Sequence, residues 1–122
     1  MVVLFSSIIF YAQDDVKIFE KVEIVANTDL KQWTDHIKKN SQLPDSVSKN
    51  IPAGTYKVNV QFIVDVHGSI GQIKAKDNPG YGLAEKAENI LRAYKGQWKP
   101  AIQCGRPVKA YRTQSMIFVI AD

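Results

Sequence analysis

The 122-residue sequence has little of several features that mark specialised classes of protein. It contains one cysteine, Cys104, so no internal disulfide framework can form. It has no block of like charges, no low-complexity tract and no visible internal repeat, which argues against disorder and repeat architectures. No apolar run reaches the roughly 18 residues that a membrane-spanning helix needs. One domain with a single core is therefore expected.

The residues that are present fit an ordinary globular domain, with 45% hydrophobic and 23% charged residues and a formal net charge of +4. From Ile51 onward, ten Lys and Arg stand against five Asp and Glu. These basic residues occur singly among apolar ones, as on the solvated faces of strands and helices, and no nucleic-acid recognition motif accompanies them. Nucleic acid is therefore not an expected partner.

Residues 1–13 are almost wholly apolar, and the run from Val2 to Ala12 has the length of a signal-peptide hydrophobic region. This predicts export, with a mature chain that begins at Asp14. Two bulky aromatic residues near the end of the run depart from the usual cleavage site, and a first β-strand is the alternative interpretation. No cysteine ends the run, so no lipoprotein anchor is expected. A natural start further upstream stays open.

Residues 14–53 are expected to form an N-terminal arm and a helix. Val16–Val25 is rich in β-branched residues and predicts a short strand or extended arm. Apolar residues at helical spacing then predict a helix that begins at Thr28, or at the residue before it, and ends near Asn40. A second helical turn is expected at Asp45–Asn50 before a Pro-Ala-Gly break.

Residues 54–122 carry the clearest pattern and are expected to form the main domain. Apolar and polar residues alternate over Tyr56–Val66, which predicts a long strand with one buried face. His67-Gly68 predicts a tight turn, and Ser69–Lys76 predicts the returning strand, with a bulge at Gly71.

A helix and a last strand complete the expected fold. Apolar residues recur over Leu83–Tyr94 at the spacing of one helix face. Met116–Ile120 has apolar residues on both faces of the last strand, which predicts partial cover of both. The expected fold class is α+β: a two-layer sandwich with helices packed on one face of a three-stranded antiparallel sheet, in the order β-β-α-β. The expected core consists of Tyr56, Val58, Val60, Phe62, Leu83, Ala87, Ile90, Leu91, Trp98 and Phe118.

Five landmarks follow one another along the second half of the chain. The alternating hairpin of Gly54–Ile70 precedes the helical segment Leu83–Ala87, and Trp98-Lys99-Pro100-Ala101 follows. Gly105-Arg106-Pro107-Val108 and the closing Met116-Ile117-Phe118 complete the series. In this order they resemble the C-terminal domain family of TonB, the periplasmic energy transducer, with its W-x-P-A and G-x-P-V motifs.

The resemblance covers about Phe19 to Ile120 and implies a periplasmic, non-enzymatic domain that binds another protein. In TonB the C-terminal strand pairs with a short segment of outer-membrane receptors, so an outer-membrane receptor or another envelope protein is the implied partner and the only link to the membrane. The 122 residues contain neither the transmembrane anchor nor the Pro-rich linker of a full transducer. The implied partner-binding residues are Tyr111, Arg112, Thr113, Gln114, Ser115, Ile117 and Val119.

Two other uses of the last strand stay open. Natural proteins usually protect a long apolar edge, so either Val16–Val25 or a second copy of the chain is an alternative occupant. A homodimer of this kind would be a self-associating scaffold of the cell envelope. If the partner binds away from the last strand, the basic surface of Lys99, Arg106 and Lys109 is the expected secondary site.

No catalytic site, metal site or cofactor is expected. The residues available for such chemistry are His36, Asp65, His67 and Cys104, and no two of them have ligand or nucleophile–base spacing in the sequence. Gly80-Tyr81-Gly82 lacks the third glycine of a dinucleotide-binding fingerprint. An enzyme with Cys104 as its nucleophile is the alternative in this class.

We predict that the exported protein loses its leader. Intact-mass measurement on protein taken from its native periplasm should give a chain that starts at or near Asp14, because a signal peptidase would remove residues 1–13. A mature protein that still carries Met1 would contradict this mode of export.

Overall fold

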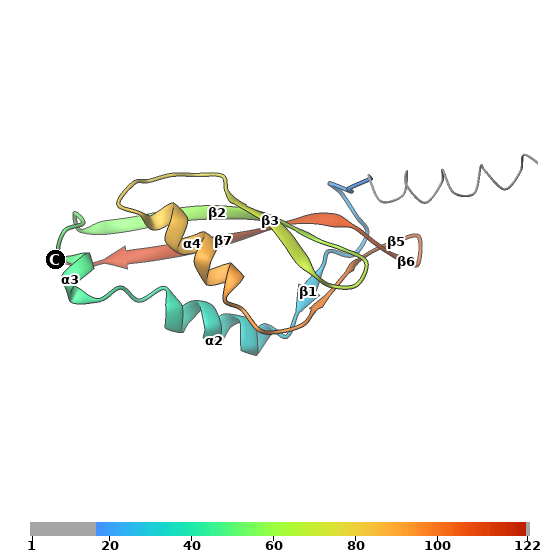
Figure 1. Ribbon diagram of the computed structural model, residues 1–122, viewed down its shortest axis with the longest axis horizontal. Helices are drawn as coiled ribbons and strands as arrows, with labels where there is room; N and C mark the ends of the chain where they lie inside the picture. The colour runs from blue at the N-terminus through green and yellow to red at the C-terminus, as the bar shows by residue number, and fades with distance from the viewer. Residues whose placement is uncertain (1–16, 122) are drawn as a thin grey trace, which may run out of the picture.

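The computed structural model describes residues 17–121, and the predicted leader at residues 1–13 lies outside them. Within this range three strands form an antiparallel sheet in the order β3-β2-β7 (Figure 1). Two short antiparallel pairs, β1 with β4 and β5 with β6, accompany it. The mixture of a three-stranded antiparallel sheet with helices agrees with the expected α+β class. The elements are β1 Asn27–Thr28, α2 Leu30–Asn40, α3 Asp45–Ser48, β2 Gly54–Val64, β3 Ile70–Ala75, α4 Leu83–Arg92, β4 Trp98–Lys99, β5 Ala101–Gln103, β6 Arg106–Val108 and β7 Ala110–Ile120.

Alternate residues of the central strand β2 point to opposite faces of the sheet, a core face and an open face. Its alternate residues Val58, Val60, Phe62 and Val64 are fully buried, as the alternation predicted. Nine of the ten expected core residues are buried. The tenth, Tyr56, is half-buried against the same core, and its hydroxyl group donates to the carbonyl of Pro52 at 2.6 Å.

An aromatic cluster joins the two longer helices to the core face. Trp33 of α2 packs edge-on against Tyr94, which follows α4, and against Trp98, with ring centroids 4.7 and 5.4 Å apart. Trp98 packs in turn against Phe62 of β2 at 5.1 Å. The cluster therefore holds α2 and α4 over the same face of the sheet, and Trp98 packs in the core as the sequence predicted.

The first long helix begins at Leu30, two residues after Thr28, the later of its two predicted starting positions. Asp29 is the N-cap, because its carboxylate accepts the N–H of Gln32 at 2.8 Å. Thr28 lies in β1 and is engaged elsewhere: its hydroxyl group donates to the carbonyl of Gln97 at 2.6 Å. The predicted start was therefore wrong by the length of this short strand pairing.

The β2–β3 turn begins earlier than predicted, so Val66 lies outside the strand. The Asp65 carboxylate accepts the N–H groups of His67 and Ser69, both at 2.9 Å, and this closes the turn. Gly68 has a φ of +83°, and a Cβ atom there would lie 2.2 Å from the carbonyl oxygen of Trp98. Only glycine fits this close approach.

We predict that Phe62→Ala and Trp98→Ala each lower the free energy of unfolding by about 3–5 kcal/mol, because each leaves a large cavity in the core. The matched control Val119→Ala, at a side chain that is 72% exposed, should change it by less than about 0.5 kcal/mol. Urea unfolding followed by circular dichroism measures both. A loss below about 1 kcal/mol at both core positions would mean that the faces of β2 are wrongly assigned.

Candidate functional site

The strand β7 forms one edge of the sheet and is paired along one side over its whole length. Its eleven residues pair with β2 from Gly54 opposite Ile120 to Val64 opposite Ala110. On its other side, within residues 17–121, only Phe19 of the N-terminal arm forms a bridge with it. Most of this side therefore presents backbone groups that no neighbouring strand of the described chain satisfies.

The bridge to Phe19 shows which backbone groups of β7 point outward. Tyr111 donates its N–H to the carbonyl of Phe19 at 3.0 Å, and Phe19 donates its own N–H to the carbonyl of Lys109 at 2.9 Å. Because alternate residues of a strand point the same way, every second residue after Tyr111 also points outward. Within residues 17–121 the N–H groups of these residues form no hydrogen bond. We call these four residues the free edge: Thr113, Ser115, Ile117 and Val119.

The predicted partner-binding residues divide into two groups. The four residues of the free edge have their backbone outward, whereas the outward N–H of Tyr111 is already bonded to the arm. Arg112 and Gln114 point toward β2 with their backbone, and their side chains bond to Ala26 and Trp33 of the N-terminal segment. The structure therefore divides the predicted site into an available part and a part engaged in the fold.

Arg112 and Gln114 fasten the N-terminal segment to β7. The guanidinium Nε of Arg112 donates to the carbonyl of Ala26 at 2.9 Å. The indole N–H of Trp33 donates to the side-chain oxygen of Gln114 at 3.0 Å, and the amide nitrogen of Gln114 donates to the carbonyl of Ser115 at 2.9 Å. These two side chains position α2 along the strand. The sequence pattern gave no signal for the contacts with Ala26 and Trp33, since each joins residues more than 80 positions apart.

The open face of the sheet carries two exposed apolar side chains on the free edge. Ile117 is 54% exposed and Val119 is 72% exposed, opposite Lys57 and Thr55 of β2. The sequence predicted partial cover of both faces of the last strand, and on the open face this cover is incomplete at Ile117 and slight at Val119. Ile117 and Val119 stay exposed because α2 and α4 both pack on the other face, where Met116 and Phe118 are buried.

The N-terminal arm covers only the beginning of the β7 edge. Val16–Val25 was expected to form a strand or extended arm, and its described part forms two isolated bridges rather than a strand. One joins Phe19 to Ala110 and the other joins Ile24 to Ile102 of β5. The arm therefore leaves the edge after Tyr111 and turns toward the β5–β6 hairpin.

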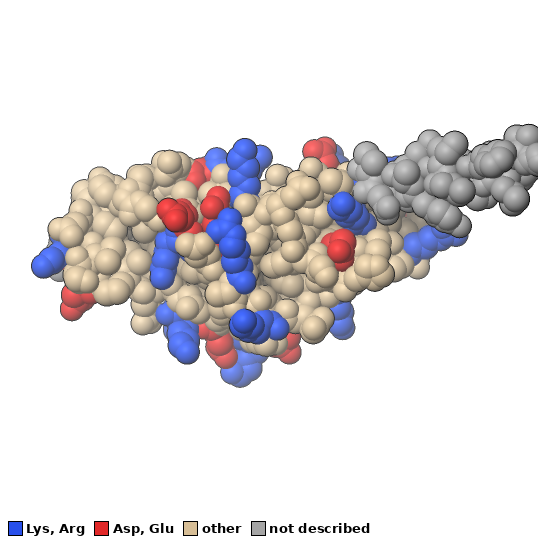
Figure 2. Space-filling view, viewed as in Figure 1, with Lys and Arg blue, Asp and Glu red and all other residues tan. Residues whose placement is uncertain are grey.

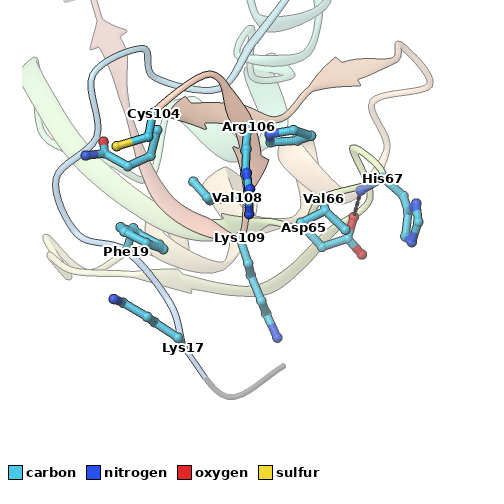
Figure 3. A pocket seen from close by; sticks show the side chains of 11 residues that line it. Lys17, Phe19, Asp65, Val66, His67, Cys104, Arg106, Val108 and Lys109 are labelled. Atoms are coloured by element: carbon cyan, nitrogen blue, oxygen red, sulfur yellow. Dashed lines mark hydrogen bonds between the residues drawn. The ribbon is translucent and has the colours of Figure 1, made fainter. Parts of the chain in front are cut away.

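The predicted basic surface divides into two places. Arg106 and Lys109 line a groove of about 830 Å³, which Lys17 and His67 also line (Figure 3). Lys99 lies in β4 and lines a different depression, beside Asn27. Figure 2 shows positive and negative side chains interspersed on the face drawn there, with no large area of one sign. The sequence missed Lys17, because only the path of the arm brings it to the groove.

The residues considered for enzymatic chemistry take part in structural contacts. Asp65 closes the β2–β3 turn, and His36 bonds through its ring to the carbonyl of Ile90 at 2.7 Å. Asp65, His67 and Cys104 all line the groove, and no hydrogen bond joins Cys104 to either of the other two in the described chain. Residues 17–121 contain no group of three or more His, Cys, Asp or Glu side chains that could hold a metal ion.

Comparison with known proteins adds no family assignment. The chain matches no protein-family model, and a search of curated proteins gives no match. In the part of the chain that the structure describes, no helix is long and apolar enough to cross a membrane.

We predict an alternating pattern of amide exchange along β7. The N–H groups of Thr113, Ser115, Ile117 and Val119 should exchange rapidly, because they have no acceptor in the described chain, whereas those of Met116 and Phe118 should exchange only when β2 and β7 separate. The N–H of Tyr111 should also exchange slowly, because it donates to the carbonyl of Phe19. Hydrogen exchange read by NMR measures each site, and equal protection of odd- and even-numbered residues would contradict the assigned free edge.

Proposed function

We propose that this chain is a periplasmic protein-binding domain of the TonB C-terminal type, which captures an extended segment of a membrane-associated partner by strand addition. The observation that carries the proposal is the free edge, with four successive outward N–H groups that have no acceptor in the described chain. A segment laid along β7 would offer a carbonyl oxygen to each. The implied partner is an outer-membrane receptor or another envelope protein, and the process served would be TonB-dependent transport.

The topology and the landmark residues support this proposal. The strands of the main sheet and α4 follow the β-β-α-β order that the sequence predicted, with the short strands β4, β5 and β6 between α4 and β7. The landmark Gly105-Arg106-Pro107-Val108 covers the second residue of a two-residue hairpin turn and the whole of β6. Cys104 and Gly105 have φ values of +53° and +73°, the backbone of a type I′ turn, in which glycine is favoured at the second position.

The open face next to the free edge favours a particular kind of segment. Side chains of an added strand lie beside those of its neighbour, so alternate residues of the captured segment would flank Ile117 and Val119. These two are the exposed apolar residues of β7. A segment of about seven residues would span Thr113–Val119, with apolar or β-branched residues at the positions that share the open face.

Self-association is the second candidate function, and the exposed Ile117 and Val119 favour it as well. A second copy that added its own β7 to this edge would pair the free N–H groups and cover both apolar side chains. The chain would then be a scaffold rather than a receptor for a peptide segment. Size-exclusion chromatography with light scattering separates the two, because strand addition to a partner requires the edge to be open in the isolated protein.

We predict that Ser115→Pro abolishes binding of peptides selected against the wild-type protein from a random extended-peptide library. Proline removes the outward N–H in the middle of the free edge, whereas Ser115→Ala keeps it and should bind within about two-fold of wild type. Fluorescence anisotropy with a labelled selected peptide measures both variants, and circular dichroism confirms that each is folded.

Gln114→Pro is the contrasting variant. Gln114 pairs with Val60 within the sheet, so loss of the backbone N–H of Gln114 should disrupt the fold itself. If folded Ser115→Pro binds the selected peptides as wild type does, strand addition to β7 is wrong. If the wild-type protein is an obligate dimer that Ser115→Pro converts to a monomer, the scaffold function replaces the proposed one.

A further inference from the structure

A depression lined by the arm and by the residues that precede β7 lies beyond the beginning of that strand, apart from the free edge. This groove of about 830 Å³ is built by four segments that meet there: the arm, the β2–β3 turn, the β5–β6 hairpin and the residues that lead into β7. Four apolar side chains form part of its wall: Phe19, Val66, Pro107 and Val108. The proposed strand addition does not use it.

Three cationic side chains stand around this apolar wall. Lys17, Arg106 and Lys109 come from three different segments and reach the same groove (Figure 3). Neither Lys17 nor Arg106 forms an ion pair within residues 17–121, and the Lys17 ammonium group lies 4.6 Å from the centre of the Phe19 ring. The single carboxylate of the lining, Asp65, uses one oxygen to close its turn. The lining therefore carries three cationic side chains and one carboxylate.

The mixture of charges and apolar groups selects one class of ligand. A nucleic-acid backbone carries a dense row of phosphates and usually needs aromatic faces on which bases stack. This groove contains a carboxylate, and the larger of its two aromatic rings, that of Phe19, already carries the ammonium group of Lys17. A peptide segment can instead place spaced carboxylates at the cations, keep them away from Asp65, and lay apolar side chains against the wall.

We infer that the groove binds an acidic, apolar-containing peptide segment of a partner protein. Its carboxylates pair with Lys17, Arg106 and Lys109, and its apolar side chains contact Phe19 and Val108. The groove recognises side chains of its ligand, whereas the free edge recognises the ligand's main chain. Binding at each site can therefore be tested separately from binding at the other.

The experiment uses a fluorescein-labelled peptide of alternating Glu and Val, with a Gln and Val peptide as its neutral counterpart. The triple variant Lys17→Gln, Arg106→Gln, Lys109→Gln should weaken binding of the acidic peptide by about three-fold or more, since each lost charge pair contributes a modest part. The matched triple variant Lys38→Gln, Lys57→Gln, Lys74→Gln has the same net charge, removes no lining residue, and should bind like wild type.

A second readout locates the peptide. Cys104 is the only cysteine, is exposed and lines the groove, so bound peptide should slow its alkylation by neutral iodoacetamide. Ser115→Pro should bind the acidic peptide as wild type does, which separates this site from the free edge. Three outcomes would each overturn the inference. The acidic peptide could bind equally weakly to both triple variants, or it could leave the alkylation rate of Cys104 unchanged. The protein could also bind oligothymidine or anionic vesicles more tightly than the acidic peptide.

Discussion

The pairing of β7 with β2 in a single register is the constraint on which the rest of the structure depends. With Val60 opposite Gln114, the alternate residues of both strands fall on the core face together. A shift of β7 by one residue would expose Phe118 and bury Ser115, so the buried face holds the register firmly. The direction of every outward N–H group of β7 follows from this register.

The aromatic cluster turns the sheet into a two-layer domain. Trp33, Tyr94 and Trp98 belong to three separate parts of the chain, and their rings meet above Phe62. The same cluster determines how far α2 extends along β7, because the indole N–H of Trp33 bonds to Gln114 at the edge of the sheet. The helix that stabilises the core thus also borders the strand on which the proposed function depends.

The sequence predicted the elements whose periodicity persists and missed those that are too short to have one. Alternation identified β2, and helical spacing identified α4 within two residues of its observed end. The pairs β1–β4 and β5–β6 have two and three residues per strand, too few for a pattern. The predicted bulge is present in β3, and the positive φ of +49° falls on Gln72, next to the predicted Gly71. The sequence offered Val16–Val25 as one possible occupant of the β7 edge, but it did not indicate that the arm would stop at Tyr111, because a single bridge from Phe19 makes that contact.

The two edges of the sheet differ in a way that bears on function. The edge at β3 is short, interrupted by the bulge, and closed where the N–H of Ala75 donates to the carboxylate of Glu88 at 2.8 Å. These are devices by which proteins prevent unwanted strand pairing.

The edge at β7 is nearly twice as long, pairs with β2 without a bulge, and is occupied by the arm only at Tyr111. Its free residues carry no lysine and no proline, and two of them expose apolar side chains. One chain thus protects one edge and leaves the other available in the described structure. This contrast within a single sheet is the physical reason to place a partner on β7 rather than on β3.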